Sequence, residues 1–134
     1  MIVVDASVWV SALIPEDTHH DASSQWLRRV ERNEEEIAIP ALALPEIAGA
    51  IARRTGNPEL GKKAVSLVLR MPGLRIVPLD ARAGEVAADS AARYRLRGAD
   101  AVYLAAAHAL RAPLATLDHE LRERAGESIA VIEL

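Results

Sequence analysis

The chain has 134 residues, of which 51% are apolar, and it carries a formal net charge of −3 at pH 7. This length and apolar content fit one domain with a substantial core and argue against a disordered chain. The absence of cysteine excludes disulfides, Cys-based zinc sites and thiol catalysis, and the scarcity of Trp, Tyr and Phe weighs against modules that bind single strands by aromatic stacking.

The sequence also bears on where the protein acts and on what it binds. Its pI is about 5.8, so any contact with nucleic acid must come from local basic patches. The N-terminus lacks a basic region, and no stretch approaches the length of a membrane span. We therefore expect a cytoplasmic protein with no membrane contact and no signal peptide.

Five short runs rich in β-branched and apolar residues predict strands. In chain order they are Ile2–Asp5, Ile37–Ile39, Arg75–Leu79, Pro113–Thr116 and Ile129–Ile132. The segments between them have the apolar spacing of helices.

In the first long helical segment, residues 18–33, Thr18 is expected to cap a helix with one face formed by Ala22, Trp26 and Val30. Residues 41–54 predict a second helix, and breaks at 56–58 and 71–73 delimit a third. An apolar stripe along these last two helices is expected to be core, although its outer edge would suit a partner helix. The stripe is Ile47, Ile51, Leu60, Leu67 and Val68.

Asp80 is expected to cap the next helix, in residues 80–97, and Gly98 separates that helix from an Ala-rich one. The predicted buried face of the first of these helices is Ala83, Val86, Ala87, Ser90, Ala91 and Tyr94.

This alternation of strands and helices predicts an α/β fold: one domain over residues 1–134, with a mostly parallel five-stranded sheet flanked by helices. In such folds, ligands bind beyond the carboxyl ends of the strands, near the point where the strand order reverses. Asp5 lies at such an end.

Three further acids occupy related positions. Glu46 lies early in the helix after the second strand, Asp100 opens the Ala-rich helix, and Asp118 follows the fourth strand. Each has an ordinary alternative, since Asp5 and Asp118 could cap helices, Asp100 could be a first-turn acid, and Glu46 could be a solvated helix residue. If all four acids had only these ordinary roles, nothing would require them to lie at the same edge of the sheet. Because their positions place all four at that edge, we expect the four carboxylates to form a site.

Converging carboxylates repel one another unless a cation lies between them. A hard divalent ion such as Mg²⁺ or Mn²⁺ prefers oxygen ligands of this kind. Without a nucleophilic Cys, a Ser-His pair or a phosphate-binding glycine loop, such a site indicates metal-assisted phosphodiester hydrolysis. Among the histidines, only His119 is kept as a candidate for substrate contact.

Four blocks of the sequence resemble the PIN-domain ribonuclease family, and in particular its VapC-like toxin branch. They occur in the family's order and spacing and together span essentially the whole chain. The blocks are IVVDASVWVSALI, PALALPEIAGAIARR, LRGADAVYLAAAHAL and APLATLDHELRERA.

The resemblance implies the PIN-like three-layer fold and a Mg²⁺- or Mn²⁺-dependent endoribonuclease. Its metal ligands would correspond to Asp5, Glu46, Asp100 and Asp118. Thr116 would orient Asp5 or the water, and Ser7 would either do the same or cap a helix. The family also implies a homodimer and a small cognate antitoxin as partners, in addition to the RNA substrate.

Basic side chains are candidates for phosphate contact, although most would be ordinary surface charges. Arg95 and Arg97 lie closest in sequence to the proposed site. The full set is Arg28, Arg29, Arg53, Arg54, Lys62, Lys63, Arg93, Arg95 and Arg97.

Two rival functions stay open at this point. An aspartyl phosphatase would use Asp5 as nucleophile, but Ser7 stands where that class has its second acid. A non-catalytic PIN-like module would bind RNA or a protein partner, although such a module has no need of all four acids.

Overall fold

The computed structural model, which describes residues 1–134, contains one five-stranded sheet in which every strand pairing is parallel. The strand order is β3-β2-β1-β4-β5, so β1 is central. The strands are β1 Ile2–Val4, β2 Ile37–Pro40, β3 Leu74–Val77, β4 Leu114–Ala115 and β5 Val131–Ile132. The predicted α/β class and five-stranded sheet are confirmed.

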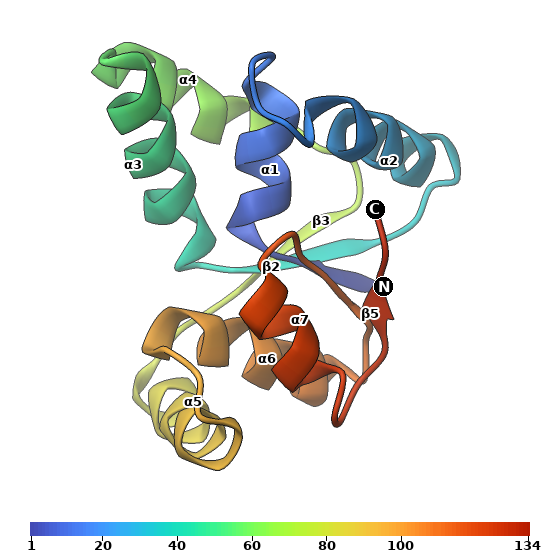
Figure 1. Ribbon diagram of the computed structural model, residues 1–134, viewed down its shortest axis with the longest axis vertical. Coiled ribbons are helices and arrows are strands. Elements are labelled where there is room, and N and C mark those ends of the chain that lie inside the picture. The colour runs from blue at the N-terminus through green and yellow to red at the C-terminus, as the bar shows by residue number, and fades with distance from the viewer.

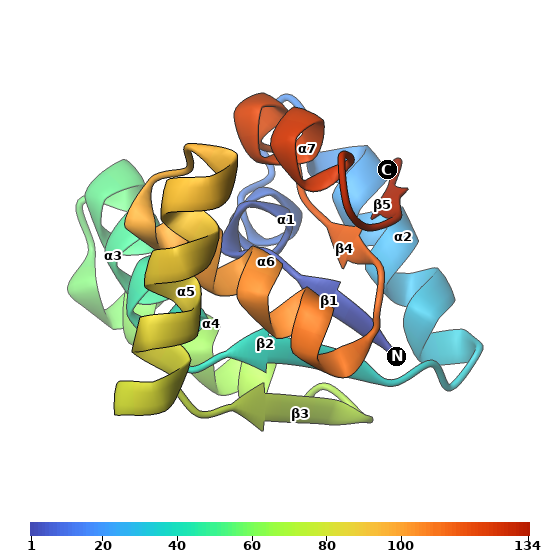
Figure 2. The same cartoon turned by 90° about the horizontal axis from the view of Figure 1, so that it is seen from below.

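Seven helices cover the sheet on both faces. Figure 1 shows α1–α4 on one side of the sheet and α5–α7 on the other, and Figure 2 shows α5 and α6 from the second side. The helices are α1 Ala6–Leu13, α2 His20–Arg32, α3 Ala43–Thr55, α4 Pro58–Leu69, α5 Ala81–Tyr94, α6 Gly98–Leu110 and α7 His119–Ala125. The result is the predicted three-layer arrangement.

The order of the strands determines where a ligand can bind. The chain adds β2 and then β3 on one side of β1, and afterwards returns to place β4 on the other side. Because parallel crossovers are right-handed, this reversal sends the two groups of helices to opposite faces. The helices diverge where the order reverses, beyond the carboxyl ends of β1 and β4.

The sheet is buried at its centre. Every residue of β1 and β2 is buried, and Val3 and Val4 are fully inaccessible to solvent. Strands that are covered on both faces carry apolar side chains on both, which explains why these runs do not alternate with polar residues.

Some element boundaries differ from the predicted ones. Asp5 and Thr116 lie just beyond β1 and β4, and β3 ends at Val77 because the following Pro78 has no amide hydrogen to donate. The predicted Thr18 cap is wrong: α2 begins at His20 and no side chain caps it.

The predicted Asp80 cap is confirmed, because the Asp80 carboxylate accepts a hydrogen bond from the Ala83 amide at 2.9 Å. The same helix corrects another prediction. Val86 was expected on the buried face, but it is 47% exposed, since α5 buries only Ala87 and Ser90.

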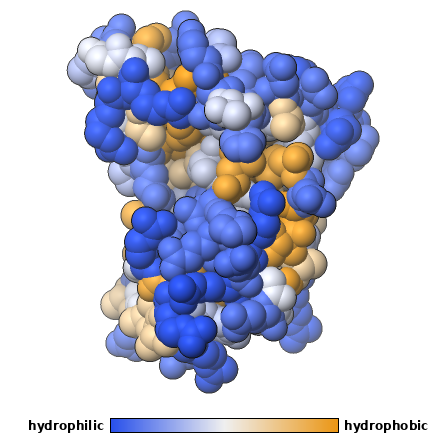
Figure 3. Space-filling view, viewed as in Figure 1, coloured by the Kyte–Doolittle hydropathy of each residue, from blue (hydrophilic) through white to orange (hydrophobic).

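Two leucines of α4 were also wrongly predicted to be core. Leu60 and Leu67 are 42% and 46% exposed. The helix instead buries the adjacent row of Gly61, Ala64 and Val68. Figure 3 shows apolar surface near α3 and α4. Leu60 and Leu67 line a pocket together with Ile51 of α3.

No helix combines the length and the apolar character needed to cross a bilayer.

The close approach of α3 and α4 depends on Gly61. A Cβ atom at this position would lie 2.5 Å from the Ala48 carbonyl oxygen, a backbone atom that cannot easily move. We expect Gly61→Ala to lower the free energy of unfolding by about 1–3 kcal/mol, as overpacking does, measured by urea denaturation.

Gly84→Ala is the matched control. Gly84 lies in exposed α5 with no atom within 4 Å of a Cβ at that position. Here we expect the opposite sign, a gain of up to about 1 kcal/mol from helix propensity. Equal effects of the two substitutions would contradict the packing assigned to α3 and α4.

Candidate functional site

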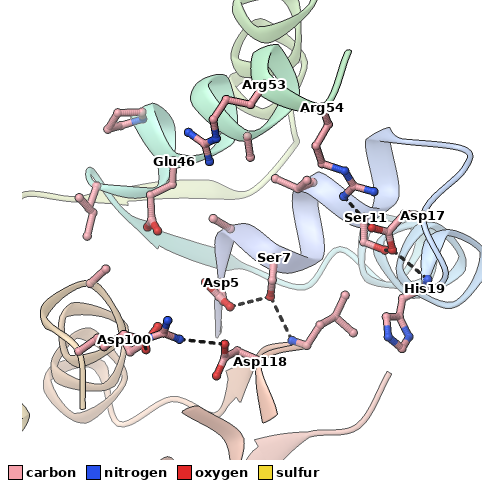
Figure 4. Close-up of a pocket in the computed structure, with 18 residues that line it drawn as sticks. Asp5, Ser7, Ser11, Asp17, His19, Glu46, Arg53, Arg54, Asp100 and Asp118 are labelled. Carbon is pink, nitrogen blue, oxygen red and sulfur yellow. Dashed lines mark hydrogen bonds and ion pairs between the residues drawn. The ribbon is translucent and has the colours of Figure 1, made fainter. Parts of the chain in front are cut away.

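A cavity of about 860 Å³ opens beyond the carboxyl ends of β1 and β4. All four predicted acids line it, and they come from four different parts of the chain (Figure 4). Asp5 follows β1, Glu46 lies in the first turn of α3, Asp100 in the first turn of α6, and Asp118 directly precedes α7.

The carboxylate of Asp5 is the most buried of the four, with 6% of the residue exposed. Its Oδ2 atom accepts hydrogen bonds from Ser7 Oγ and Thr116 Oγ1, both at 2.6 Å. Each hydroxyl in turn accepts a backbone amide, from Leu117 at 3.1 Å and from Asp118 at 3.0 Å. The two hydroxyls therefore fix Asp5 to the loop that follows β4. The alternative role of Asp5 as a side-chain cap is not observed.

Glu46 is held by a buried tyrosine. Tyr103 Oη donates a hydrogen bond to Glu46 Oε1 at 2.6 Å and accepts one from the Ala6 amide at 3.3 Å. Burial raises the pKa of the Tyr103 phenol above its usual value, and the neighbouring Asp5 and Glu46 charges raise it further. The phenol is therefore a permanent donor that aims Glu46 at the cavity.

Asp100 and Asp118 share one arginine. Arg97 Nε lies 3.2 Å from Asp100 Oδ2, and Arg97 Nη2 lies 3.4 Å from Asp118 Oδ2. Asp118 also caps α7, because its Oδ1 atom accepts the Leu121 amide at 2.8 Å. The helix-capping role expected as an alternative for Asp118 is thus present. Its second carboxylate oxygen, Oδ2, still faces Arg97 in the cavity. The Arg97 side chain is 70% exposed.

Burial and neighbouring charges raise the pKa values of three of the carboxylates. Burial raises the pKa of Asp5, and the Asp118 charge adds to the effect, while hydrogen bonds from Ser7 and Thr116 oppose it. Burial likewise raises the pKa of Glu46, with further increases from Asp5 and Asp100. The pKa of Asp100 is raised by burial and then by Asp118, against the Arg97 charge. The four acids therefore form one electrostatic unit.

This donor set fits a hard divalent cation. Four carboxylates line one cavity with negative charge in excess, and oxygen ligands suit Mg²⁺ and Mn²⁺. No three acidic or histidine side chains converge closely enough in this arrangement to hold an ion together. Tyr103 and Arg97 occupy oxygens of Glu46, Asp100 and Asp118, so an ion would bind with a rearrangement of these side chains.

The remaining predicted site residues fall into two groups. Ser7 and Arg97 line the cavity, and Thr116 lies behind Asp5 with no exposed surface. Arg95 and His119 do not line it. Arg95 ends α5 in a left-handed conformation, and the side chain of His119 is 83% exposed, 3.2 Å from Glu123.

The sequence analysis missed two features of the site. Tyr103 received no role, although it lies three residues after Asp100, on the same face of one helix. The second feature is a hydrogen-bonded group centred on Asp17, which accepts from Ser11 Oγ, the His19 amide and Arg54 Nη1. No sequence spacing signals these contacts.

Comparison with known proteins adds a family to this geometry. The PIN domain family model matches residues 2–127, nearly the whole chain. Among curated proteins, no sequence matches.

Several solved structures share the fold. VapC20 of Mycobacterium tuberculosis, a toxin that cleaves the sarcin-ricin loop, superposes with a TM-score of 0.80 at 17% identity, covering 100% of both chains. VapBC2 of Rickettsia felis, bound to a promoter DNA fragment, gives 0.74 at 18% identity and covers 100% of this chain and 99% of its own. A toxin-antitoxin complex of Klebsiella pneumoniae gives 0.71 at 16% identity, with 99% and 97% covered. These likenesses establish the fold.

The raised pKa of Asp5 predicts a pH-dependent effect of Asp5→Asn. A carboxyl with a raised pKa in the folded state costs stability when ionised, and this cost disappears as the pH falls toward the unfolded pKa. The amide oxygen of Asn can accept both hydroxyl donors, since both bond to one oxygen of Asp5. In EDTA we expect Asp5→Asn to be more stable than wild type at pH 7 and the difference to disappear as the pH falls toward about 4, the pKa of an unfolded Asp, measured by urea unfolding.

Asp17→Asn serves as the control of opposite sign. Burial alone would raise the pKa of Asp17, but hydrogen bonds from His19, Arg54 and Ser11 lower it to about 2. This substitution should destabilise the protein at pH 7, and its effect should shrink only as the pH falls below about 4. An Asp5→Asn protein less stable than wild type at pH 7 would contradict the electrostatics assigned to the site.

Proposed function

The chain belongs to the PIN domain family, and on that premise we propose that it is a divalent-metal-dependent endoribonuclease and the toxin of a toxin–antitoxin pair. The observation that carries the proposal is the presence of four carboxylates around one cavity where the strand order reverses. They are Asp5, Glu46, Asp100 and Asp118. The whole chain acts as one PIN-like domain in this proposal.

The four acids would hold Mg²⁺ or Mn²⁺ through their carboxylate oxygens. Such an ion, when bound, lowers the pKa of an attacking water and stabilises charge on the leaving oxygen of a phosphodiester. Ser7 and Thr116 keep Asp5 in one orientation, and Tyr103 does the same for Glu46. Glu46, which Tyr103 holds at the cavity, is placed to accept the proton of the water.

The cavity offers no competing nucleophile. Its lining contains no cysteine, and its two serine hydroxyls, Ser7 and Ser11, both donate to carboxylates. An aspartyl phosphatase has less support, because Ser7 supplies a hydrogen bond where that class needs a second acid, and because Asp5 is largely buried.

The partners proposed from the family are RNA, a small antitoxin and a second copy of the chain, all in the cytoplasm. The solved complexes from Rickettsia felis and Klebsiella pneumoniae support the antitoxin. Two exposed apolar surfaces are available for protein partners. One includes Leu60 and Leu67 of α4, and the other includes Leu79, just before α5, and Val86 of α5.

Asp100→Asn tests the proposed nuclease directly. We expect it to lower the rate of RNA cleavage with Mg²⁺ or Mn²⁺ by at least about 100-fold, since removal of a metal ligand costs more than the 10–100-fold typical of its supporting contacts. Cleavage would be measured with end-labelled RNA, and the fold checked by circular dichroism.

Asp89→Asn is the matched control, because Asp89 is an exposed acid of α5 outside the cavity. It should cleave at the wild-type rate. Metal should also stabilise wild type, by about 2.7 kcal/mol at 100 times Kd, and Asp100→Asn by much less. Metal-dependent stabilisation without any cleavage of RNA would favour a non-catalytic binding module. Cleavage by Asp100→Asn at the wild-type rate would overturn the proposed site.

A further inference from the structure

The cavity that holds the four acids extends to a second group of side chains that the proposed reaction does not use. This group, here called the basic arm, consists of Ser11, Asp17, His19, Arg53 and Arg54. Figure 4 shows its two arginines reaching down from α3 on the side of the cavity away from Asp100.

The charges of the cavity are unequal in number and in pairing. Five carboxylates and three arginines line it. Arg97 is paired with Asp100 and Asp118, and Arg54 lies 2.7 Å from Asp17. Arg53 forms no ion pair. It is therefore the one permanent cation of the cavity that is available to an incoming anion.

Asp17 is held in place by three hydrogen bonds and fixes one side of the basic arm. Its carboxylate accepts from Ser11 Oγ at 2.8 Å, from the His19 amide at 2.9 Å and from Arg54 Nη1 at 2.7 Å. Burial works against ionisation, but these three donors keep the Asp17 pKa near 2, so the carboxylate stays charged at neutral pH. Because Arg54 is paired with this charged Asp17, it does not compete with the neighbouring Arg53 for an incoming anion.

Gly49 leaves room for the side chain of Arg53 to lie along α3. A Cβ atom at Gly49, one helical turn earlier, would lie 3.1 Å from Arg53 Nη1. The open surface above Gly49 lets the guanidinium lie back along α3 toward Glu46, as Figure 4 shows. The Arg53 guanidinium therefore points into the cavity.

We propose that the basic arm is a subsite for a backbone phosphate of the RNA strand next to the scissile phosphate, with Arg53 as the contacting cation. This inference rests on the proposed function. Arg53 follows Glu46 by seven positions along α3, and Figure 4 shows its side chain on the side of the cavity away from Asp100 and Asp118. A phosphate at Arg53 is therefore distinct from one bound at Asp100 and Asp118.

The chemistry of the cavity indicates that the subsite recognises phosphate and not bases. An RNA strand close to four carboxylates is repelled, and a free cation in the same cavity offsets that repulsion. No Phe, Tyr or Trp lines the cavity, so no platform for base stacking is present. The contact should contribute affinity that is sensitive to salt and insensitive to sequence.

The test is binding of a fluorescent single-stranded RNA to the Asp100→Asn protein at several KCl concentrations, followed by anisotropy. Adding Arg53→Gln should weaken binding roughly tenfold at low salt, as expected for a charge-assisted hydrogen bond. It should also reduce the slope of log K against log salt by about 0.7, the value for one contact to a single strand.

Two further variants test whether the loss depends on the position and on the charge of Arg53. Arg70→Gln removes the same charge from an exposed position at the end of α4, outside the cavity, and should leave affinity and slope unchanged. Arg53→Lys keeps the charge and should keep the slope. Because Arg53→Lys and Arg53→Gln remove the same planar group, a loss confined to Arg53→Gln comes from the charge.

The outcomes separate this inference from the function on which it rests. If Arg53→Gln binds RNA like Arg70→Gln while the wild-type chain cleaves RNA, the subsite is wrong and the nuclease stands. A specific loss in Arg53→Gln without cleavage by wild type would support the phosphate contact at Arg53 and overturn the nuclease. Absence of both RNA binding and cleavage would overturn both.

Discussion

The structure of the site depends on one constraint, the carboxyl group of Asp5 at the buried end of the central strand. Burying a charge is costly unless hydrogen bonds and a counterion compensate it. Ser7 and Thr116 supply two hydrogen bonds to one oxygen, and each hydroxyl is fixed by a backbone amide after β4. This network ties the ends of β1 and β4 together and leaves the second carboxylate oxygen for a cation.

Around this point, the fold adds negative charge and then restrains it. The reversal of strand order brings Glu46, Asp100 and Asp118 to the same cavity, where burial and mutual repulsion raise the pKa values of the first two as well as that of Asp5. Arg97 is the only cation that forms ion pairs with these acids, and it is mostly exposed. A protein selected for stability alone would not keep such a cluster, whereas a site built for a divalent cation requires it.

Much of this arrangement could be predicted from the sequence, and the reasons are topological. Acids placed after strands and at helix starts share one edge of a parallel sheet. The convergence of the four carboxylates could therefore be predicted without knowledge of side-chain packing. The contact of Tyr103 with Glu46 spans 57 residues and arises only from the way α6 packs against α3. Similarly, the apolar pattern identified α4 but could not decide which of two adjacent rows of residues on this helix is buried. The row that includes Gly61 packs against α3 because it allows the closer approach, and this leaves Leu60 and Leu67 exposed.

The central claim, that the four carboxylates are assembled to bind a divalent cation, is tested most directly by a crystal structure grown with millimolar Mn²⁺. Anomalous scattering identifies manganese independently of any activity. The proposed site predicts an anomalous peak in contact with Asp5 and Asp100, and an Arg97 side chain that has turned away from Asp100. A crystal that shows no manganese at these carboxylates, with Arg97 still bridging Asp100 and Asp118, would contradict it.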